Sequence, residues 1–284
     1  MPENLAWGIF APCLLEYAMR FRPCIDIHNG KVKQIVGGSL KDSGNYAVDN
    51  YVADEDGAYY AGLYRDAGLR GGHIILLNKA GSQYYNEDVR QACLALAAYP
   101  GGLQIGGGMT EDNAAFFLDK GASHIIVTSY VFRDGQIDYD RLERLAAVTG
   151  KEHLVLDLSC RKKGDDYYIV TDRWQKFTDV RLSPDVLYHL SSWCDEFLVH
   201  AVDVEGRACG IEKKLAAMLG EYRGIPVTYA GGVGSYEDLR TLKKLGRNRV
   251  DVTIGSALDL FGGHIVFEKV MDIVYDKENG RSYP

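Results

Sequence analysis

Proline and clustered cysteine are scarce in this 284-residue sequence, and their scarcity excludes several classes of protein. There are 7 prolines against 32 glycines, which suits many tight turns between strands and helices rather than a disordered chain. None of the 6 cysteines forms a Cys-x-x-Cys pair, so we expect free thiols in a reducing cytoplasm rather than a zinc ribbon or a redox motif. The 7 histidines show no His-x-His or His-x-x-x-His spacing, which gives little support for a metal site.

Long apolar segments and basic clusters are also missing. No apolar run reaches the roughly 18–20 residues that cross a bilayer. The net charge is −7, and the longest basic run covers only residues 161–163, which argues against nucleic-acid binding. We therefore expect neither a membrane nor a nucleic acid as a partner, and an anionic ligand would depend on local donors.

The first 18 residues are expected to form an extension outside the fold, because the first strand begins near Phe21 and Met19 lies just ahead of it. The moderately apolar segment from Leu5 to Ala18 contains Glu16 and lacks a basic start and a cleavage site, so we expect no secretory signal. The alternative is that this extension forms a short helix docked on the fold.

From Phe21 onward, short apolar runs alternate with longer helical patterns, which favours βαβ units and a parallel sheet. The predicted strands are Arg22–Ile27, His73–Leu77, Leu103–Ile105, His124–Val127, His153–Leu158, Phe197–His200, Val227–Tyr229 and Asp251–Ile254. The predicted helices include Asp54–Ala67, Asn86–Ala98, Glu111–Lys120, Tyr139–Val148, Pro184–Trp193, Glu212–Tyr222, Tyr236–Leu245 and one near His264–Tyr275. Eight such pairs predict an α/β fold, a single-domain (β/α)8 TIM barrel over residues 19–284. A doubly wound open sheet is the alternative, although it usually has fewer strands.

A weak internal repeat divides the predicted barrel into two halves. The first half reads Cys-Ile-Asp-Ile, Ile-Gly-Gly-Gly and Ile-Val-Thr-Ser at 24–27, 105–108 and 126–129. The second half reads Val-Leu-Asp-Leu, Tyr-Ala-Gly-Gly and Thr-Ile-Gly-Ser at 155–158, 229–232 and 253–256. Two half-barrel repeats would place two carboxylates and two phosphate-type turns around one mouth.

Glycine turns follow the third and seventh predicted strands. The turn after the third strand precedes a helix expected to start at Thr110 and Glu111, and the other precedes Ser235. Bare backbone N–H groups in such turns bind anions at helix N-termini, and hydroxyls after strands four and eight could add donors. A single turn of this kind would be more simply an ordinary glycine turn, but two at matching places favour phosphate binding. The residues concerned are Gly107, Gly108, Thr128, Ser129, Gly231, Gly232, Gly255 and Ser256.

Asp26 and Asp157 lie near the carboxyl ends of predicted strands one and five, which face each other across an eight-strand ring. Period-two alternation places Asp26 on one face with Cys24. If this face is the inner one, both carboxylates reach the mouth. Each could instead be held by backbone N–H groups or pair with Arg22 or Arg161. Buried carboxylates without a role are costly, so a symmetric pair favours acid–base chemistry.

Other chemistry-bearing side chains carry less weight. His28 and His200 are interpreted as hydrogen-bonded structural residues, and Cys24 as core packing. Trp174 lies in the long segment after strand five, where it could cover a heterocyclic ligand and exclude water or simply anchor its own loop. No lysine lies within the predicted strands, which argues against a Schiff-base aldolase.

Several segments together resemble the ProFAR isomerases of histidine biosynthesis, the phosphoribosylformimino-aminoimidazole carboxamide ribotide isomerases. The resemblance covers about residues 20–275 and is nearest to the eukaryotic branch. It rests on Cys24-Ile-Asp-Ile-His-Asn-Gly-Lys-Val, Gln34-Ile-Val-Gly-Gly, Val155-Leu-Asp-Leu-Ser-Cys-Arg, His200-Ala-Val-Asp-Val-Glu-Gly and Ser256-Ala-Leu-Asp-Leu-Phe-Gly-Gly.

The resemblance implies an Amadori rearrangement of a doubly phosphorylated small molecule, without cofactor or metal. It assigns Asp26 as the general base at ribose C2 and Asp157 as the general acid at the ring oxygen. It also implies phosphate binding by the two glycine turns and their partner strand ends, and substrate contact by Trp174 or Arg161. We further expect a monomer in the cytoplasm.

Two departures from bacterial relatives weaken the resemblance locally. Those relatives carry an Asp where Leu76 stands and a Thr where Ala201 stands, so Asp203 and Glu205 are expected to do part of that work. The alternatives are the sister cyclase of the same pathway, which would need an ammonia-supplying partner, and a non-catalytic barrel that senses a phosphorylated metabolite.

Overall fold

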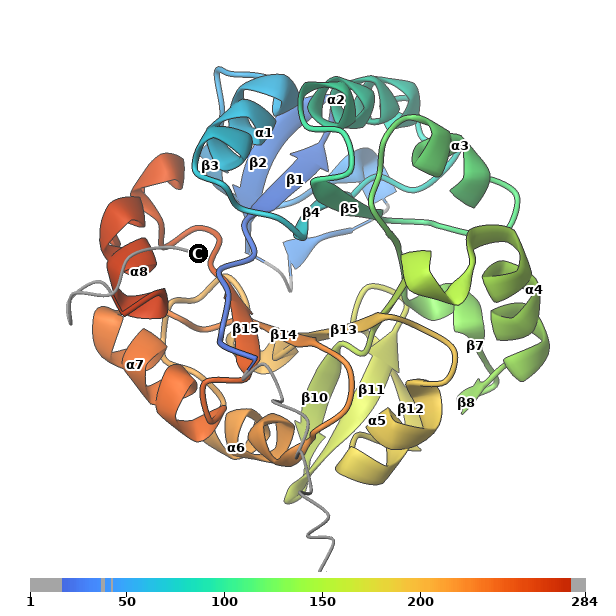
Figure 1. The fold of residues 1–284 in the computed structure, drawn as a ribbon. Coiled ribbons are helices and arrows are strands. Elements are labelled where there is room, and N and C mark those ends of the chain that lie inside the picture. Colours follow the sequence, from blue (N-terminus) through green and yellow to red (C-terminus); the bar gives the residue numbers. More distant parts are fainter. Residues whose placement is uncertain (1–16, 37–38, 42, 277–284) are drawn as a thin grey trace, which may run out of the picture.

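The computed structural model of the protein describes residues 17–36, 39–41 and 43–276. Within these ranges, parallel strands form a central barrel that helices surround (Figure 1). The barrel strands are β1 (Cys24–His28), β4 (Gly72–Leu76), β5 (Leu103–Gly106), β6 (Ile125–Val127), β9 (Leu154–Asp157), β13 (Glu196–His200), β14 (Val227–Ala230) and β15 (Val250–Thr253). Each pairs in parallel with the next, and the ring closes where Phe21 bridges Val252. The predicted (β/α)8 barrel is confirmed.

A helix follows each barrel strand and packs on the outside of the ring. The helices are α1 (Gly57–Asp66), α2 (Tyr85–Ala98), α3 (Ala114–Asp119), α4 (Tyr139–Thr149), α5 (Pro184–Leu190), α6 (Lys213–Glu221), α7 (Tyr236–Leu245) and α8 (Phe267–Val274). Their starts follow from capping: the side chains of Asp56, Asp138, Ser183 and Ser235 accept hydrogen bonds from the first turns of α1, α4, α5 and α7. Such caps satisfy N–H groups that have no partner within the helix.

The predicted start of the helix after the first glycine turn is wrong. The helix after the first glycine turn begins at Ala114, not at Thr110 or Glu111. The Asn113 side chain accepts a hydrogen bond from the Thr110 N–H at 2.9 Å and donates to the Gly108 carbonyl at 3.1 Å. Such side-chain bonds to a neighbouring backbone compete with helix formation, so a closed turn replaces the first helical turn.

Antiparallel strands are added to the barrel at three places outside the strand–helix alternation. The strands β2 (Lys31–Ile35) and β3 (Asp49–Val52) extend the sheet beyond β1. After β9, the chain forms a three-stranded sheet of β10 (Cys160–Lys163), β11 (Asp166–Thr171) and β12 (Lys176–Arg181). A short hairpin, β7 (Phe132–Arg133) and β8 (Gln136–Ile137), follows β6.

Charged side chains are buried at the amino-terminal end of the barrel. Arg22, whose side chain is 6% exposed, forms ion pairs with Asp251 at 2.7 Å and with Glu196 at 3.1 Å. Glu196 also accepts hydrogen bonds from Gln104 and Thr228. Because every member has partners, the network closes this end of the barrel without an isolated charge. The alternative pairing of Arg22 with Asp26 does not occur.

The expected extension over residues 1–18 falls mostly outside the described residues. Of its described part, Tyr17 donates a hydrogen bond to Asp251 at 2.6 Å. Met19 is fully buried and its N–H donates to the Asn248 carbonyl. Contact with the barrel therefore begins no later than Tyr17. None of the helices in the described ranges is long and apolar enough to cross a membrane.

Candidate active site

A cavity of about 770 Å³ opens at the carboxyl ends of the barrel strands. Ligand sites in barrels of this kind lie at the same end, and the volume is in the range of small-molecule sites. Every residue predicted for the site lines this cavity except Arg161. These residues are Asp26, Gly107, Gly108, Thr128, Ser129, Asp157, Trp174, Gly231, Gly232, Gly255 and Ser256.

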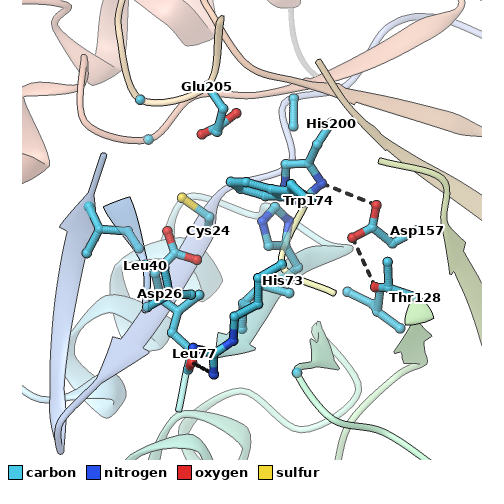
Figure 2. A pocket seen from close by; sticks show the side chains of 18 of the residues that line it. Cys24, Asp26, Leu40, His73, Leu77, Thr128, Asp157, Trp174, His200 and Glu205 are labelled. Carbon is cyan, nitrogen blue, oxygen red and sulfur yellow. Dashed lines mark hydrogen bonds and ion pairs between the residues drawn. The ribbon is translucent and has the colours of Figure 1, made fainter. Parts of the chain in front are cut away.

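Asp26 and Asp157 enter the cavity from β1 and β9, which are four places apart in the ring of eight strands. Figure 2 shows the two carboxylates on opposite sides of the cavity, with His73, Trp174 and His200 between them. The expected inward orientation of both aspartates is confirmed. The strand alternation that places Asp26 beside Cys24 on the inner face therefore also holds for Asp157.

Among the described residues, one side chain donates a hydrogen bond to Asp26. The Gln34 amide, on β2, donates to Asp26 Oδ2 at 3.1 Å and approaches Cys24 Sγ at 3.6 Å. Burial, together with the nearby charge of Glu205, raises the pKa of Asp26 to about 7. A carboxyl group whose pKa lies near neutrality suits proton abstraction and return at physiological pH.

Asp157 has several donors. Its Oδ1 accepts from the Ser159 N–H at 2.9 Å and the Ser159 hydroxyl at 2.7 Å, and lies 3.3 Å from His200 Nδ1. Its Oδ2 accepts from Thr128 at 3.2 Å. Burial alone would raise the pKa of Asp157, but the His200 charge and these hydrogen bonds hold it below its usual value. The two aspartates therefore differ, since Asp157 is ionised where Asp26 titrates.

His200 lies at the end of β13 and contacts both Asp157 and Trp174. Burial opposes its ionisation, yet the charge and hydrogen bond of Asp157, with Glu205 and Asp26 nearby, raise the pKa of His200 to about 9. Its ring centre lies 5.7 Å from that of Trp174 and 6.4 Å from that of His73. Burial lowers the pKa of His73 to about 3. The pKa values of the two rings are therefore shifted in opposite directions.

Trp174 is held over the cavity by an unusual backbone segment. Asp172, Arg173 and Trp174 all have positive φ angles, from 51° to 66°, a region that residues other than glycine seldom adopt. The indole N–H donates to the Ser159 hydroxyl at 3.0 Å, and the Asp172 N–H donates to the Ser129 hydroxyl at 3.1 Å. The indole therefore lines the Asp157 side of the cavity, and its hydrogen bond to Ser159 anchors its own loop.

In each glycine turn, a backbone carbonyl oxygen lies where a side chain would begin. At Gly107 (φ +97°) a Cβ would lie 2.1 Å from the Leu76 carbonyl oxygen, and at Gly232 (φ +77°) 2.2 Å from that of Gly210. Glycine alone combines these φ angles with such close backbone contacts. The second turn precedes the Ser235 cap of α7, as expected for an anion site at a helix N-terminus. The first precedes the Asn113 turn instead.

Of Arg161 and the two acidic residues after β13, Asp203 and Glu205, one lines the cavity and two do not. Arg161 donates from Nε to Asp203 at 2.8 Å and lies over the Phe177 ring, away from the cavity. Arg173 lines the cavity in its place and donates to the Leu77 carbonyl at 3.0 Å. Of the two acidic residues after β13, Glu205 lines the cavity and Asp203 does not.

Sequence reasoning missed three groups of this site as functional residues. Gln34 comes from a strand that the pattern did not predict. His200 was interpreted as structural, and Ser159 was not considered. A signal was present for Ser159, because it lies two residues after Asp157 and therefore on the same side of the chain. No such local signal exists for Gln34 or His200, since each reaches its aspartate from another strand.

Fold and cavity together define a (β/α)8-barrel protein with opposed carboxylates and paired glycine turns at the carboxyl ends of its strands. Comparison with known proteins gives the family. The chain belongs to the histidine biosynthesis protein family, whose profile matches residues 20–265.

Curated relatives in plants and fungi share most of the chain's length. A Medicago truncatula protein is 52% identical over 265 residues, covering 92% of this chain and 83% of its own. It is named as a chloroplastic 1-(5-phosphoribosyl)-5-((5-phosphoribosylamino)methylideneamino)imidazole-4-carboxamide isomerase. Proteins with the same isomerase name from Neurospora crassa and Saccharomyces cerevisiae are 47% and 42% identical, covering 86% and 87% of this chain and 93% and 94% of their own.

Proposed function

We propose that this protein is the histidine-biosynthesis isomerase for which its relatives are named, converting ProFAR, the bis-phosphoribosyl imidazole carboxamide, into its phosphoribulosyl form. One observation carries the proposal beyond the family: Asp26 and Asp157 face each other in one cavity from β1 and β9. An aldose–ketose interconversion needs one group to open the sugar ring and another to move the C2 proton. Two opposed carboxyl groups with different pKa values meet that need.

Asp26 acts as the general base in this mechanism. It removes the C2 proton after the ring has opened, and its pKa of about 7 makes proton return to C1 easy. The acid at the Asp157 end protonates the ring oxygen, while the substrate nitrogen supplies its lone pair to form the Schiff base. This chemistry requires proton transfers only, each typically worth ~10²–10⁴ in rate.

The phosphate groups bind at the two glycine turns. Gly107, Gly108, Thr128 and Ser129 line one end of the cavity, and Gly231, Gly232, Gly255 and Ser256 line the other. The net charge of the chain is −7, so it offers no general attraction for phosphate. Glycine N–H groups and hydroxyls instead supply local hydrogen-bond donors. Arg173 is a better candidate for a substrate contact than Arg161, because only Arg173 lines the cavity.

Turnover of ProFAR by the purified protein without ammonia tests the proposal. We expect conversion in the wild type and a loss of at least ~10²-fold in kcat for Asp26→Asn and for Asp157→Asn, with modest change in binding. Asp119→Asn, at the exposed end of α3, is the matched control and should retain activity. Dependence on ammonia would favour the cyclase, and tight ProFAR binding without conversion would favour a sensor.

The proposal also covers the oligomeric state and the cellular compartment of the protein. A monomer is sufficient, since both aspartates and both glycine turns come from one chain; sedimentation at assay concentration checks this. We propose residence in the cytoplasm, and localisation of the tagged full chain tests it against the plastid named for the Medicago relative.

A further inference from the structure

His200 lies among titratable groups from four parts of the barrel. Asp157 on β9 is its hydrogen-bond partner, His73 on β4 packs against its ring, and the charges of Asp26 on β1 and Glu205 after β13 act on it. Figure 2 shows the imidazole with Asp157 on one side and Asp26 and Glu205 on the other. Three carboxyl groups and one uncharged imidazole therefore surround this histidine.

The hydrogen-bond directions around Asp157 determine which nitrogen of His200 carries hydrogen. The Trp174 indole N–H can only donate, so the Ser159 hydroxyl oxygen accepts it. The Ser159 hydroxyl hydrogen is then free for Asp157 Oδ1, which lies at 2.7 Å. Oδ1 also accepts the Ser159 N–H, which is a donor only. Because Oδ1 is an acceptor in both bonds, His200 Nδ1 must bring a hydrogen to the contact at 3.3 Å.

With a second hydrogen on Nε2, the imidazole of His200 is a cation. A neutral ring would leave the ionised Asp157 without a counter-charge, in a site where the side chains of His200 and Asp157 are only 12% and 9% exposed. A buried charge needs a partner. Lys79 and Arg173 also line the cavity, but the basic side chain in contact with Asp157 is that of His200, at 3.3 Å. Charge balance therefore favours an imidazolium next to a carboxylate.

We propose that His200 stores the proton that opens the sugar ring, so that the acid of this enzyme is the His200–Asp157 pair rather than a protonated Asp157 alone. The proposal rests on the isomerase function proposed above and adds His200 to it as a positioning residue that acts through Asp157. The pKa values agree in direction, because the pKa of His200 is raised and that of Asp157 is lowered.

Ring opening then takes two proton transfers. The Nδ1 proton of His200 moves to the Asp157 carboxylate, and the carboxylic acid so formed transfers it to the ring oxygen. The bond between that oxygen and C1 breaks with its electron pair going to oxygen, while the nitrogen lone pair forms the C1–nitrogen double bond. Asp26 later moves a proton from C2 to C1. The C2 hydroxyl releases its proton as the ketone forms, and that proton restores the imidazolium.

The pH dependence of turnover separates this role from a structural one. In the wild type, Asp26 must be ionised and the His200–Asp157 pair must hold its proton, so kcat/KM should be bell-shaped between about pH 7 and about pH 9. In His200→Gln, the basic limb should fall by at least about one pH unit, because a lone carboxyl group loses its proton at lower pH. The acidic limb should rise, because the His200 charge lowers the pKa of Asp26.

The matched control is His189→Gln, which removes an exposed histidine on α5 whose ring packs against that of Tyr139. It should leave both limbs in place. At about pH 8 we expect His200→Gln to lose at least about ten-fold in kcat with little change in KM. An unmoved basic limb in a His200→Gln protein that melts like the wild type would overturn the proposal, as would an unchanged kcat.

A second measurement does not depend on turnover. In ¹⁵N-histidine-labelled protein, the His200 signals are those missing in His200→Gln. In the enzyme without substrate, we expect Nδ1 to stay protonated over the whole pH titration and Nε2 to titrate near pH 9. In Asp157→Asn the pKa of His200 should be lower. Titration below neutrality, or hydrogen on Nε2 alone in the neutral form, refutes the proposal. If ProFAR is not converted at all, the isomerase function fails while these spectra still decide the protonation of His200.

Discussion

The Gln34 amide donates to the Asp26 carboxylate at 3.1 Å, so a strand outside the barrel ring holds one side of the acid–base pair. The same amide has its oxygen against Gly255, where a Cβ would lie only 2.2 Å from Oε1. One side chain on β2 therefore couples the base to a glycine turn at the end of β15. Asp26 has no other hydrogen-bond donor among the described residues, which makes its pKa sensitive to Gln34.

Replacing Gln34 by Met should raise the pKa of Asp26 further, because the hydrogen bond from Gln34 lowers it. The base must be ionised to work, so the acidic limb of kcat/KM should move upward from about pH 7 by a few tenths of a unit to about one unit. A pH–rate profile checks this. Gln136→Met, on the exposed hairpin strand β8, is the control. A downward shift would contradict the assignment of Asp26 as the base.

The two aspartate variants should change stability in opposite directions. The folded pKa of Asp26 is raised to about 7, so its contribution to stability is fully present below its unfolded pKa of about 3.9 and is lost as the pH rises through about 7. Asp26→Asn removes the buried charge and should raise the free energy of unfolding by about 1–3 kcal/mol at about pH 8.

Asp157→Asn should do the reverse. The folded pKa of Asp157 is lowered, so its contribution to stability is present above the unfolded pKa and is lost as the pH falls through the folded value. Losing this carboxylate leaves His200 without its counter-charge, and we expect a loss of about 1–3 kcal/mol at about pH 8. Denaturant unfolding of both variants tests these two predictions. A change in the free energy of unfolding with the same sign for both would show that the two environments do not differ as described.

Arg22 should matter for stability more than for catalysis. Its side chain is 6% exposed and pairs with Glu196 and Asp251 at the end of the barrel opposite the cavity. Arg22→Met strands two buried carboxylates and should cost about 3–5 kcal/mol. Arg90→Met, whose ion pair with Glu87 is about half exposed, should cost less than about 1 kcal/mol. Chemical denaturation gives both values, and equal losses would contradict the buried-network interpretation.

Gly107→Ala should damage both the turn and ligand binding. Its Cβ would lie 2.1 Å from the Leu76 carbonyl oxygen at a φ of +97°, so the backbone must move away from the proposed phosphate position. We expect at least about ten-fold higher KM and a lower melting temperature. Gly101→Ala is the control, because Gly101 also has a positive φ (+68°) but nothing within 4 Å of the added Cβ. Equal effects would mean that φ strain alone acts.

The regular part of this barrel could be predicted from the sequence because each apolar run and each amphipathic run carries its own local signal. The Asp26 and Asp157 positions followed from strand alternation and from the internal repeat. The start of α3 did not, since the Asn113 side chain competes locally with the helix. Neither did the importance of Gln34 or His200, whose partners lie 8 and 43 positions away along the chain. Arg161 was predicted to contact the substrate, but it pairs with Asp203 and does not line the cavity.

The barrel ring closes between the segment before β1 and the last barrel strand, β15, through the backbone bonds of Arg20 and Arg22 with Val252 and through the buried contact of Arg22 with Asp251. No helix joins the two sides of this seam, whereas a helix joins every other pair of neighbouring barrel strands. A force that pulls the segment before β1 away from β15 would therefore act on this seam directly. Peeling β15 away from the segment before β1 would open the ring and separate Asp251 from the arginine that neutralises it.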